Sequence, residues 1–279
     1  MTGRADVATR AIIGPEVKIE QRDCLEFLNG LPDSSVDIIV TDPAYSGMNQ
    51  HMRFGRGRIV GEYRSDDNPR WFREFHDDPI TYRHFLAECC RVLRPNRHLY
   101  VMFDSYSLLT LGALVRDYFA VKSVIVWDKV KLGMGHYFRR RHEFVVFATK
   151  GARKLSRRDL PDVWRFRRIH PPRYPTQKPV ELFEAMLAGS VEPGDVVCDP
   201  FVGSGSSAIA ALRRRCRFVG CDISARAVSF CAERLSEFQE TGLDPAQPSS
   251  ALVEGDQYDW LLDSTERRRS AVVYRRSPD

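Results

Sequence analysis

Short apolar runs alternate along the chain with longer segments whose apolar residues recur at helical spacing. Runs rich in β-branched and aromatic residues, which are typical of strands, cover residues 17–21, 37–42, 98–104, 122–128, 143–149, 195–199 and 217–222. Helical spacing is found between them, as in residues 80–93, 179–189 and 207–215. The alternation predicts an α/β fold, with a doubly wound and mostly parallel sheet covered by helices on both faces.

Several of the predicted strands end in an aspartate. These terminal residues include Asp42, Asp104, Asp128, Asp199 and Asp222. Ligands of parallel sheets bind beyond the carboxyl ends of the strands, where such side chains can face them. We therefore expect the aspartates to share one site at that edge of the sheet.

The length of the chain favours one domain with added loops. At 279 residues and 43% hydrophobic composition, residues 1–279 can bury one sizeable core. Two long loops are expected at residues 46–79 and 150–178, and loops of that length are usually functional or disordered. The tail, residues 240–279, is expected to be partly disordered because of its Pro, Ser and basic content.

Composition excludes some classes of protein. No stretch approaches the roughly 20 apolar residues that span a bilayer, and the first residues lack the apolar core of a secretion signal. We expect a soluble protein of the cytoplasm, of bacterial type. The seven cysteines include no CxxC pair and mostly lie in apolar runs, so we expect reduced thiols, no disulfide and no metal site.

The basic residues are clustered, although the net charge is only +5. Arginines gather at residues 139–141, 165–168, 213–215 and 267–269. Arginine forks suit phosphate oxygens, so the clusters indicate a polyanionic partner. Solvated helix faces produce the same clusters, and that alternative stays open for each of them.

A glycine loop follows one of the predicted strands. The strand ends at Asp199, Gly203 and Gly205 lie in the loop, and a helix of small residues begins near Ser206. Such a loop lets backbone amides approach a ligand, and the acid at the end of the next strand, Asp222, suits ribose hydroxyls. A nucleoside-containing cofactor fits, whereas a missing third glycine and a missing GK[ST] disfavour NAD and ATP. The alternative is a tight turn that packs helix on strand.

A second segment of interest, TDPAY, follows the strand of residues 37–42. An exocyclic amine on a base is a poor nucleophile because its lone pair is delocalised into the ring. The carboxylate of Asp42 and the carbonyl of Pro43 are suited to accept its two N–H groups, and Tyr45 is suited to stack on a base outside the duplex. An ordinary turn after a strand is the alternative.

Three motifs together closely resemble the amino-methyltransferases of restriction-modification systems. They are TDPAY (41–45), PTQKPVELFEAML (175–187) and CDPFVGSGSSAIAA (198–211). Their order, with the catalytic motif before the cofactor motif, is similar to the circularly permuted β class, and the resemblance covers most of residues 16–235. It implies the Rossmann-like fold of S-adenosylmethionine-dependent methyltransferases.

The resemblance also implies which residues hold the methionine part of S-adenosylmethionine. Phe201, Gly203 and Gly205 would cradle it beside Asp199. Ser206 stands where the family commonly has threonine, a change expected to matter little.

The rest of the cofactor is assigned in the same way. The resemblance implies that Asp222 holds the ribose and that Asp23, with the backbone of Cys24, lies near the adenine. Thr176 and Lys178 match the motif that closes over the carboxylate end of the cofactor.

The strand HEFVVFATKG is similar to the family motif beside the target base, which makes Arg141, His142 and Glu143 candidates. Two departures concern that pocket. Ala44 replaces the more usual second proline, and Tyr174 stands where a histidine usually precedes Pro-Thr-Gln-Lys-Pro.

The two long loops are candidates for DNA contacts. The first, residues 46–79, interleaves arginines such as Arg53, Arg56 and Arg58 with aromatic residues that suit a flipped nucleotide. A disordered loop or a subunit contact is an equal alternative. The second, residues 150–174 with Arg167 and Arg168, matches the place of the target-recognition region but is short.

These expectations converge on a site-specific methyltransferase that modifies adenine N6 in double-stranded DNA by base flipping. In the family, an aspartate in the position of Asp42 accompanies adenine more often than cytosine. Methylation of cytosine N4 is the main alternative, followed by a DNA-binding protein without activity and a methyltransferase for small molecules or proteins. A C5-cytosine enzyme is disfavoured because Cys198 lies inside a strand and no Pro-Cys occurs. A homodimer and a cognate restriction endonuclease are partners expected from the resemblance.

Overall fold

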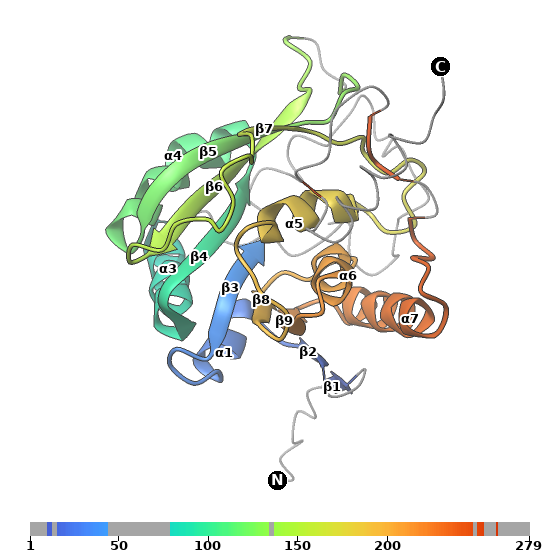
Figure 1. Cartoon of the computed structure of the whole chain (residues 1–279), viewed down its shortest axis with the longest axis horizontal. Coiled ribbons are helices and arrows are strands. Elements are labelled where there is room, and N and C mark those ends of the chain that lie inside the picture. The colour runs from blue at the N-terminus through green and yellow to red at the C-terminus, as the bar shows by residue number, and fades with distance from the viewer. Residues whose placement is uncertain are drawn as a thin grey trace, which may run out of the picture.

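The computed structural model describes residues 10–12, 16–43, 79–133, 137–247, 250–253 and 261. Within these residues, nine strands form one sheet in the order β1-β2-β9-β8-β3-β4-β6-β5-β7 (Figure 1). The strands are β1 (Arg10–Ile12), β2 (Val17–Gln21), β3 (Val36–Thr41), β4 (Leu93–Phe103), β5 (Ala120–Asp128), β6 (His142–Lys150), β7 (Val163–Arg165), β8 (Val196–Asp199) and β9 (Arg217–Asp222). The pairs β1·β2, β4·β6 and β5·β6 are antiparallel, and the other five neighbouring pairs are parallel.

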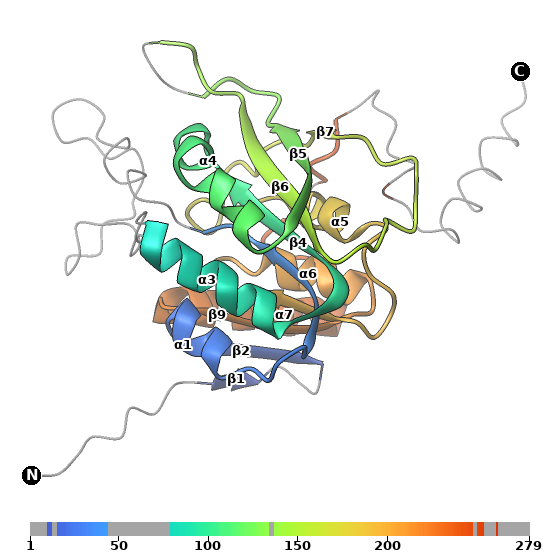
Figure 2. The same cartoon turned by 90° about the vertical axis from the view of Figure 1, so that its left-hand side faces the viewer.

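Helices cover both faces of the sheet, as Figures 1 and 2 show. One face carries α1 (Cys24–Asn29), α3 (Pro79–Val92), α4 (Ser105–Leu111) and the 3-10 helix η1 (Gly112–Asp117). The other carries α5 (Val180–Leu187), α6 (Ser206–Arg213) and α7 (Ala225–Thr241). The α/β doubly wound fold expected from the alternating pattern is therefore confirmed.

The core has two halves because successive residues of a strand point to opposite faces. In β3, Ile38 and Val40 join the cluster beneath α5, α6 and α7, whereas Ile39 joins the cluster beneath α1 and α3. All three side chains are fully buried. This burial on both faces explains why β3 reads as a continuous apolar run.

Three segments differ from the expectation. Residues 150–178 were expected to form one long loop, but they contain β7, which pairs in parallel with β5 at the edge of the sheet. The strand expected at residues 98–104 begins earlier, at Leu93, directly after α3. Part of the tail is also packed into the domain, since Asp244, Gln247 and Ala251 are buried.

No helix among the described residues is long and apolar enough to cross a membrane. All seven cysteines are described, and all are free thiols.

Candidate active site

The carboxyl ends of the central strands bring two of the predicted motifs together. β3 and β8 are parallel neighbours, so Thr41 at the end of one lies beside Asp199 at the end of the other. The hydroxyl of Thr41 donates to Oδ1 of Asp199 at 2.9 Å. The segment Asp42–Pro43 therefore begins next to the glycine loop, although 156 positions separate Asp42 from Cys198 in the sequence.

Asp199 organises the start of the glycine loop. Its buried carboxylate accepts hydrogen bonds from the backbone N–H of Phe201 at 2.9 Å and from Ser207 Oγ at 2.6 Å. Burial raises the pKa of Asp199 to about 7, against the effect of these donors. The loop then turns through Gly205, whose φ of +81° and close approach to Cys231 leave no room for a side chain: a Cβ would lie 2.4 Å from that Sγ.

Asp222 closes the other side of the loop. Its carboxylate accepts from the backbone N–H groups of Gly203 and Ser224, each at 2.9 Å, and burial raises its pKa. A carboxylate has about four acceptor sites, so two remain for ribose hydroxyls. The free acceptor sites of Asp222 thus fit a cofactor that carries a nucleoside.

The predicted adenine edge lies beside Asp222, because β2 and β9 are parallel neighbours. Asp23 caps α1 by accepting from the backbone N–H of Leu25 at 2.9 Å. Cys24 is buried, and burial raises the pKa of its thiol to about 12, so the thiol stays protonated. The structure therefore places Cys24 close to both Asp23 and Asp222.

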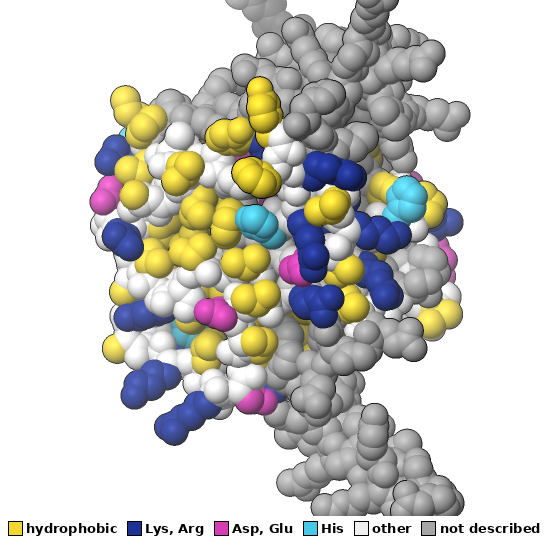
Figure 3. Space-filling model, turned by 90° about the horizontal axis from the view of Figure 1, so that it is seen from above, with side chains coloured by type: hydrophobic (Ala, Val, Ile, Leu, Met, Phe, Trp, Pro, Cys, Tyr) yellow, Lys and Arg dark blue, Asp and Glu magenta, His cyan; other side chains and the backbone are white. Residues whose placement is uncertain are grey.

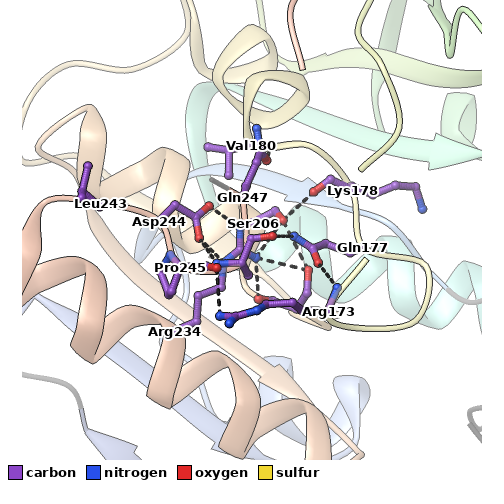
Figure 4. Close-up of polar contacts among 12 residues, drawn as sticks. Arg173, Gln177, Lys178, Val180, Ser206, Arg234, Leu243, Asp244, Pro245 and Gln247 are labelled. Atoms are coloured by element: carbon purple, nitrogen blue, oxygen red, sulfur yellow. Dashed lines mark hydrogen bonds and ion pairs between the residues drawn. The ribbon is translucent and has the colours of Figure 1, made fainter. Parts of the chain in front are cut away.

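The Pro-Thr-Gln-Lys-Pro segment lies against the start of α6. Ser206 Oγ donates to the carbonyl of Lys178 at 2.7 Å. Thr176 is exposed and has a left-handed φ of 56°, which is strained for a β-branched residue and typical of functional turns. The side chain of Lys178, however, extends away from Ser206 in Figure 4 and pairs with Asp42.

Arg234, which was not among the predicted site residues, supports the glycine loop from α7. Its guanidinium is 1% exposed and pairs at 2.6 Å with Asp244, which is equally buried (Figure 4). It also donates to the carbonyl of Ser204 at 2.8 Å and to Ser206 Oγ at 3.1 Å. The sequence pattern of α7 could have revealed this arginine, because it lies between Cys231 and Leu235 on the buried face of the helix. A charge in that position requires a partner.

The first part of the tail is tied to the same region, as Figure 4 shows. The side chain of Gln247 accepts from the backbone N–H of Val180 at 2.8 Å and donates to Glu181 at 2.5 Å. Gln177 donates to the carbonyl of Ala246 at 2.9 Å. The tail therefore packs against residues 177–181, and this segment contacts the start of α6 through the carbonyl of Lys178 and Ser206 Oγ.

Next to the glycine loop, charges of alternating sign surround Asp42. Lys178 Nζ contacts Oδ2 of Asp42 and lies 3.8 Å from Glu143 Oε2, while Lys129 Nζ donates to Glu143 Oε1 at 2.8 Å. Burial raises the pKa of Asp42, and Lys178 opposes this shift. Burial would also raise the pKa of Glu143, but Lys178 and Lys129 hold it below its usual range.

Basic residues rim this part of the site. Arg141 is exposed and forms a two-bond ion pair with Asp128, at 2.7 and 2.6 Å, which lowers the pKa of that carboxyl. His142, the first residue of β6, and Arg167 and Arg168, which follow β7, are also exposed. Lys and Arg side chains gather on the upper face of the molecule in Figure 3.

The expected meeting of strand-end aspartates is thus correct only in part. Asp42, Asp199 and Asp222 lie around the glycine loop, but Asp128 is paired with Arg141. Asp104 caps α4 by accepting from the N–H groups of Tyr106 and Ser107. The remaining predicted residues, which are Tyr45, Arg53, Arg56 and Arg58, lie outside the described residues.

Among the residues that the structure describes, no group of three or more His, Cys, Asp or Glu side chains could hold a metal ion. The fold and the glycine loop define an S-adenosylmethionine-dependent methyltransferase. The chain belongs to the DNA methylase family of N6 and N4 methyltransferases, whose signature matches residues 36–233. The resemblance seen in the motifs is therefore confirmed, and the protein is a DNA methyltransferase.

Relatives of known activity are similar over most of the chain. The type II methyltransferase M2.DpnII of Streptococcus pneumoniae is 27% identical over 242 residues, which cover 78% of this chain and 89% of the relative. The type II methyltransferase M.HhaII of Haemophilus parahaemolyticus is 29% identical over 210 residues, with coverages of 71% and 87%.

Solved structures share the fold. The cytosine-N4-specific PvuII DNA methyltransferase superimposes with a TM-score of 0.60 at 13% identity, covering 97% of this chain and 95% of that chain. The M1.HpyAVI–SAM complex superimposes with a TM-score of 0.56 at 20% identity, covering 78% and 99%.

Proposed function

We propose that the protein transfers a methyl group from S-adenosylmethionine to N6 of adenine in duplex DNA, with the target base flipped out of the helix. The observation that carries the proposal is the position of Asp42, which leaves β3 beside the glycine loop and is anchored there through Thr41 and Asp199. This position supports a role for the carboxylate beside the expected methyl donor. The choice of adenine rests on the resemblance, in which aspartate at this position favours that base.

In the proposed reaction, Asp42 and Pro43 activate the amine. The carboxylate of Asp42 and the carbonyl of Pro43 each accept one N–H, so the nitrogen becomes tetrahedral and its lone pair points at the donor. When bound, S-adenosylmethionine would supply an electrophilic methyl group carried on its sulfonium sulfur, which is the leaving group of the transfer. The nitrogen then loses one proton, for which the carboxylate of Asp42 is an acceptor at hand.

Two further parts of the proposal concern DNA. Tyr45 would stack on the flipped base, and the exposed Arg167 and Arg168 would contact phosphates beside the pocket. The cofactor roles given above to Thr176 and to the pair Asp23 and Cys24 also stay proposals. A homodimer, a cognate restriction endonuclease and a cytoplasmic location remain predictions.

The test is methyl transfer from labelled S-adenosylmethionine to mixed-sequence duplex DNA, followed by digestion to nucleosides and mass analysis. We expect N6-methyladenine with the native chain and none with Asp42→Asn. Asp33→Asn is the matched control, because Asp33 is exposed and pairs with Arg91 on the surface. N4-methylcytosine would overturn the choice of base, and full activity of Asp42→Asn would overturn the mechanism.

A further inference from the structure

Lys178 occupies a position that the proposed reaction makes unexpected. Its ammonium contacts Asp42, the carboxylate that has to accept an N–H of the target amine. An isolated ion pair would neutralise that carboxylate and compete for its lone pairs. A second acid, Glu143, lies on the other side of the same ammonium, with Oε2 at 3.8 Å from Nζ.

The four charged groups come from separate parts of the fold. Asp42 follows β3, Glu143 lies in β6, Lys129 follows β5 and Lys178 precedes α5. The side chains of Lys178 and Lys129 are 13% and 9% exposed, and those of Asp42 and Glu143 are 27% and 26% exposed, so water screens these charges only in part. Such a cluster of four charged groups is not explained by fold stability, because the cost of desolvating the charges is about as large as the gain from pairing them.

We propose that Lys178 and Glu143 are positioning residues for Asp42. Lys178 holds the carboxylate ionised and oriented through Oδ2, which leaves Oδ1 for the amine, and Glu143 holds Lys178 from the opposite side. Lys129 anchors Glu143 through its other oxygen, Oε1, at 2.8 Å. This inference rests on the proposed function, because it assigns the groups that prepare Asp42 for that reaction.

Lys178 and Glu143 have opposite effects on the pKa of Asp42. Burial raises the pKa of Asp42, Lys178 and Lys129 lower it, and Glu143 raises it. Two further charged groups contribute: Asp199 interacts electrostatically with Asp42, and Arg168 lowers the pKa of Glu143.

These signs predict how the rate depends on pH, since a protonated Asp42 cannot serve as the acceptor. Removal of the charge of Lys178 should raise the pKa of Asp42 and move the acidic limb of the pH–rate profile to higher pH. Removal of the charge of Glu143 should lower that pKa and move the limb to lower pH. A merely structural role would move both limbs in the same direction or neither.

The experiment measures single-turnover methyl transfer from roughly pH 5 to 9 with Lys178→Met and Glu143→Gln, at saturating cofactor. We expect the limb of Lys178→Met to shift upward by about one unit or more, with a rate at neutral pH lowered on the order of tenfold. Glu143→Gln should shift it downward by less. Cofactor affinity should stay within about twofold of the native value, which is below 0.5 kcal/mol.

Matched controls are Lys18→Met in β2, whose partner Glu20 keeps its ion pair with Arg22, and Glu88→Gln in α3, which removes a charge from a partly exposed pair with Arg91. Both should keep the native profile. Weakened cofactor binding by Lys178→Met with an unmoved limb would overturn the inference in favour of a cofactor contact. Parallel shifts in the two variants would overturn it as well. If Lys178→Met does not fold, Lys178→Gln takes its place. The comparison with Glu143→Gln then shows whether the acidic limbs of the two variants shift in opposite directions or in the same direction.

A second measurement separates this inference from the proposed function. The pKa of Asp42 can be followed by carbon NMR of labelled carboxylates, assigned with Asp42→Asn. The two variants should shift this pKa in opposite directions even if the native chain transfers no methyl group to DNA. In that event the proposed function fails while the electrostatic coupling stands, whereas an unchanged pKa in both variants overturns the coupling itself.

Discussion

The cofactor side and the target side of the site are built differently. On the cofactor side, short contacts fix the loop: backbone N–H groups donate to Asp199 and Asp222, and the ion pair of Arg234 with Asp244 is 1% exposed. At the outer rim of the side that we assign to the target base, long side chains reach into solvent, as in the pair of Arg141, which is 45% exposed, with Asp128. Lys178 and Lys129 lie beneath this rim and are mostly buried.

The difference matches the two ligands. One small cofactor needs the same geometry in every cycle, and preorganised groups provide it at no cost during the reaction. A DNA duplex has to bind and leave, and exposed charges allow this because salt and water screen them. Changes on the cofactor side should therefore disturb folding, and changes at the rim should mainly alter DNA binding.

The largest effect is expected at Gly205. In Gly205→Val the new side chain would overlap Cys231, since a Cβ alone lies 2.4 Å from its Sγ, and the φ of +81° adds strain. We expect loss of cofactor binding in calorimetry and a much lowered yield of folded protein. Gly203→Val is the comparison: its φ of +50° also strains a side chain, but its Cβ meets only a backbone oxygen, at 3.9 Å, so we expect a smaller loss of folded protein together with weakened cofactor binding. Normal cofactor binding by Gly205→Val would contradict the role of the loop.

The next effect is expected at the buried ion pair. Asp244→Ala leaves the guanidinium of Arg234 buried without its partner, so we expect a loss of about 3–5 kcal/mol in the free energy of unfolding. Urea denaturation measures it. Asp33→Ala breaks the exposed pair with Arg91 and should cost less than about 1 kcal/mol. Equal losses in the two variants would show that the tail does not hold the loop.

The smallest effect on the fold is expected at the rim. Arg167→Ala and Arg168→Ala remove exposed charges, so we expect weaker DNA binding and a salt slope reduced by about one for each phosphate that is no longer neutralised. Fluorescence anisotropy over a range of salt concentrations measures it, and cofactor affinity should stay unchanged. Arg213→Ala is a control at the far end of α6, where Arg213 pairs with Glu184. A salt slope unaffected by Arg167→Ala and Arg168→Ala would exclude this rim from the DNA interface.

Much of the fold could be predicted from local patterns. β9 coincides with the predicted run at residues 217–222 because it presents apolar side chains to both faces of the sheet, Phe218 to one and Cys221 to the other. β2 coincides with the run at residues 17–21 because Val17 and Ile19 alternate with polar residues and point to one face. β7 was missed because it has three residues, and the edge position leaves its first residue, Val163, exposed. Such a strand owes its existence to pairing with β5 rather than to its own pattern.

For the site, too, local features could be predicted from the sequence and contacts between distant residues could not. The motifs around Asp42 and Gly205 were visible because backbone turns and strand ends impose particular residues over a few positions. The partner of Lys178 could not be predicted in this way, because Asp42 lies 136 positions away in the sequence. The roles of Arg234 and Asp244 depend on how α7 and the tail pack. The sequence by itself determined which backbone segments could form the site, whereas the direction and the charge partner of each long side chain depended on packing. Those interactions join residues far apart in the chain, and their strength depends on burial that exists only once the domain has folded.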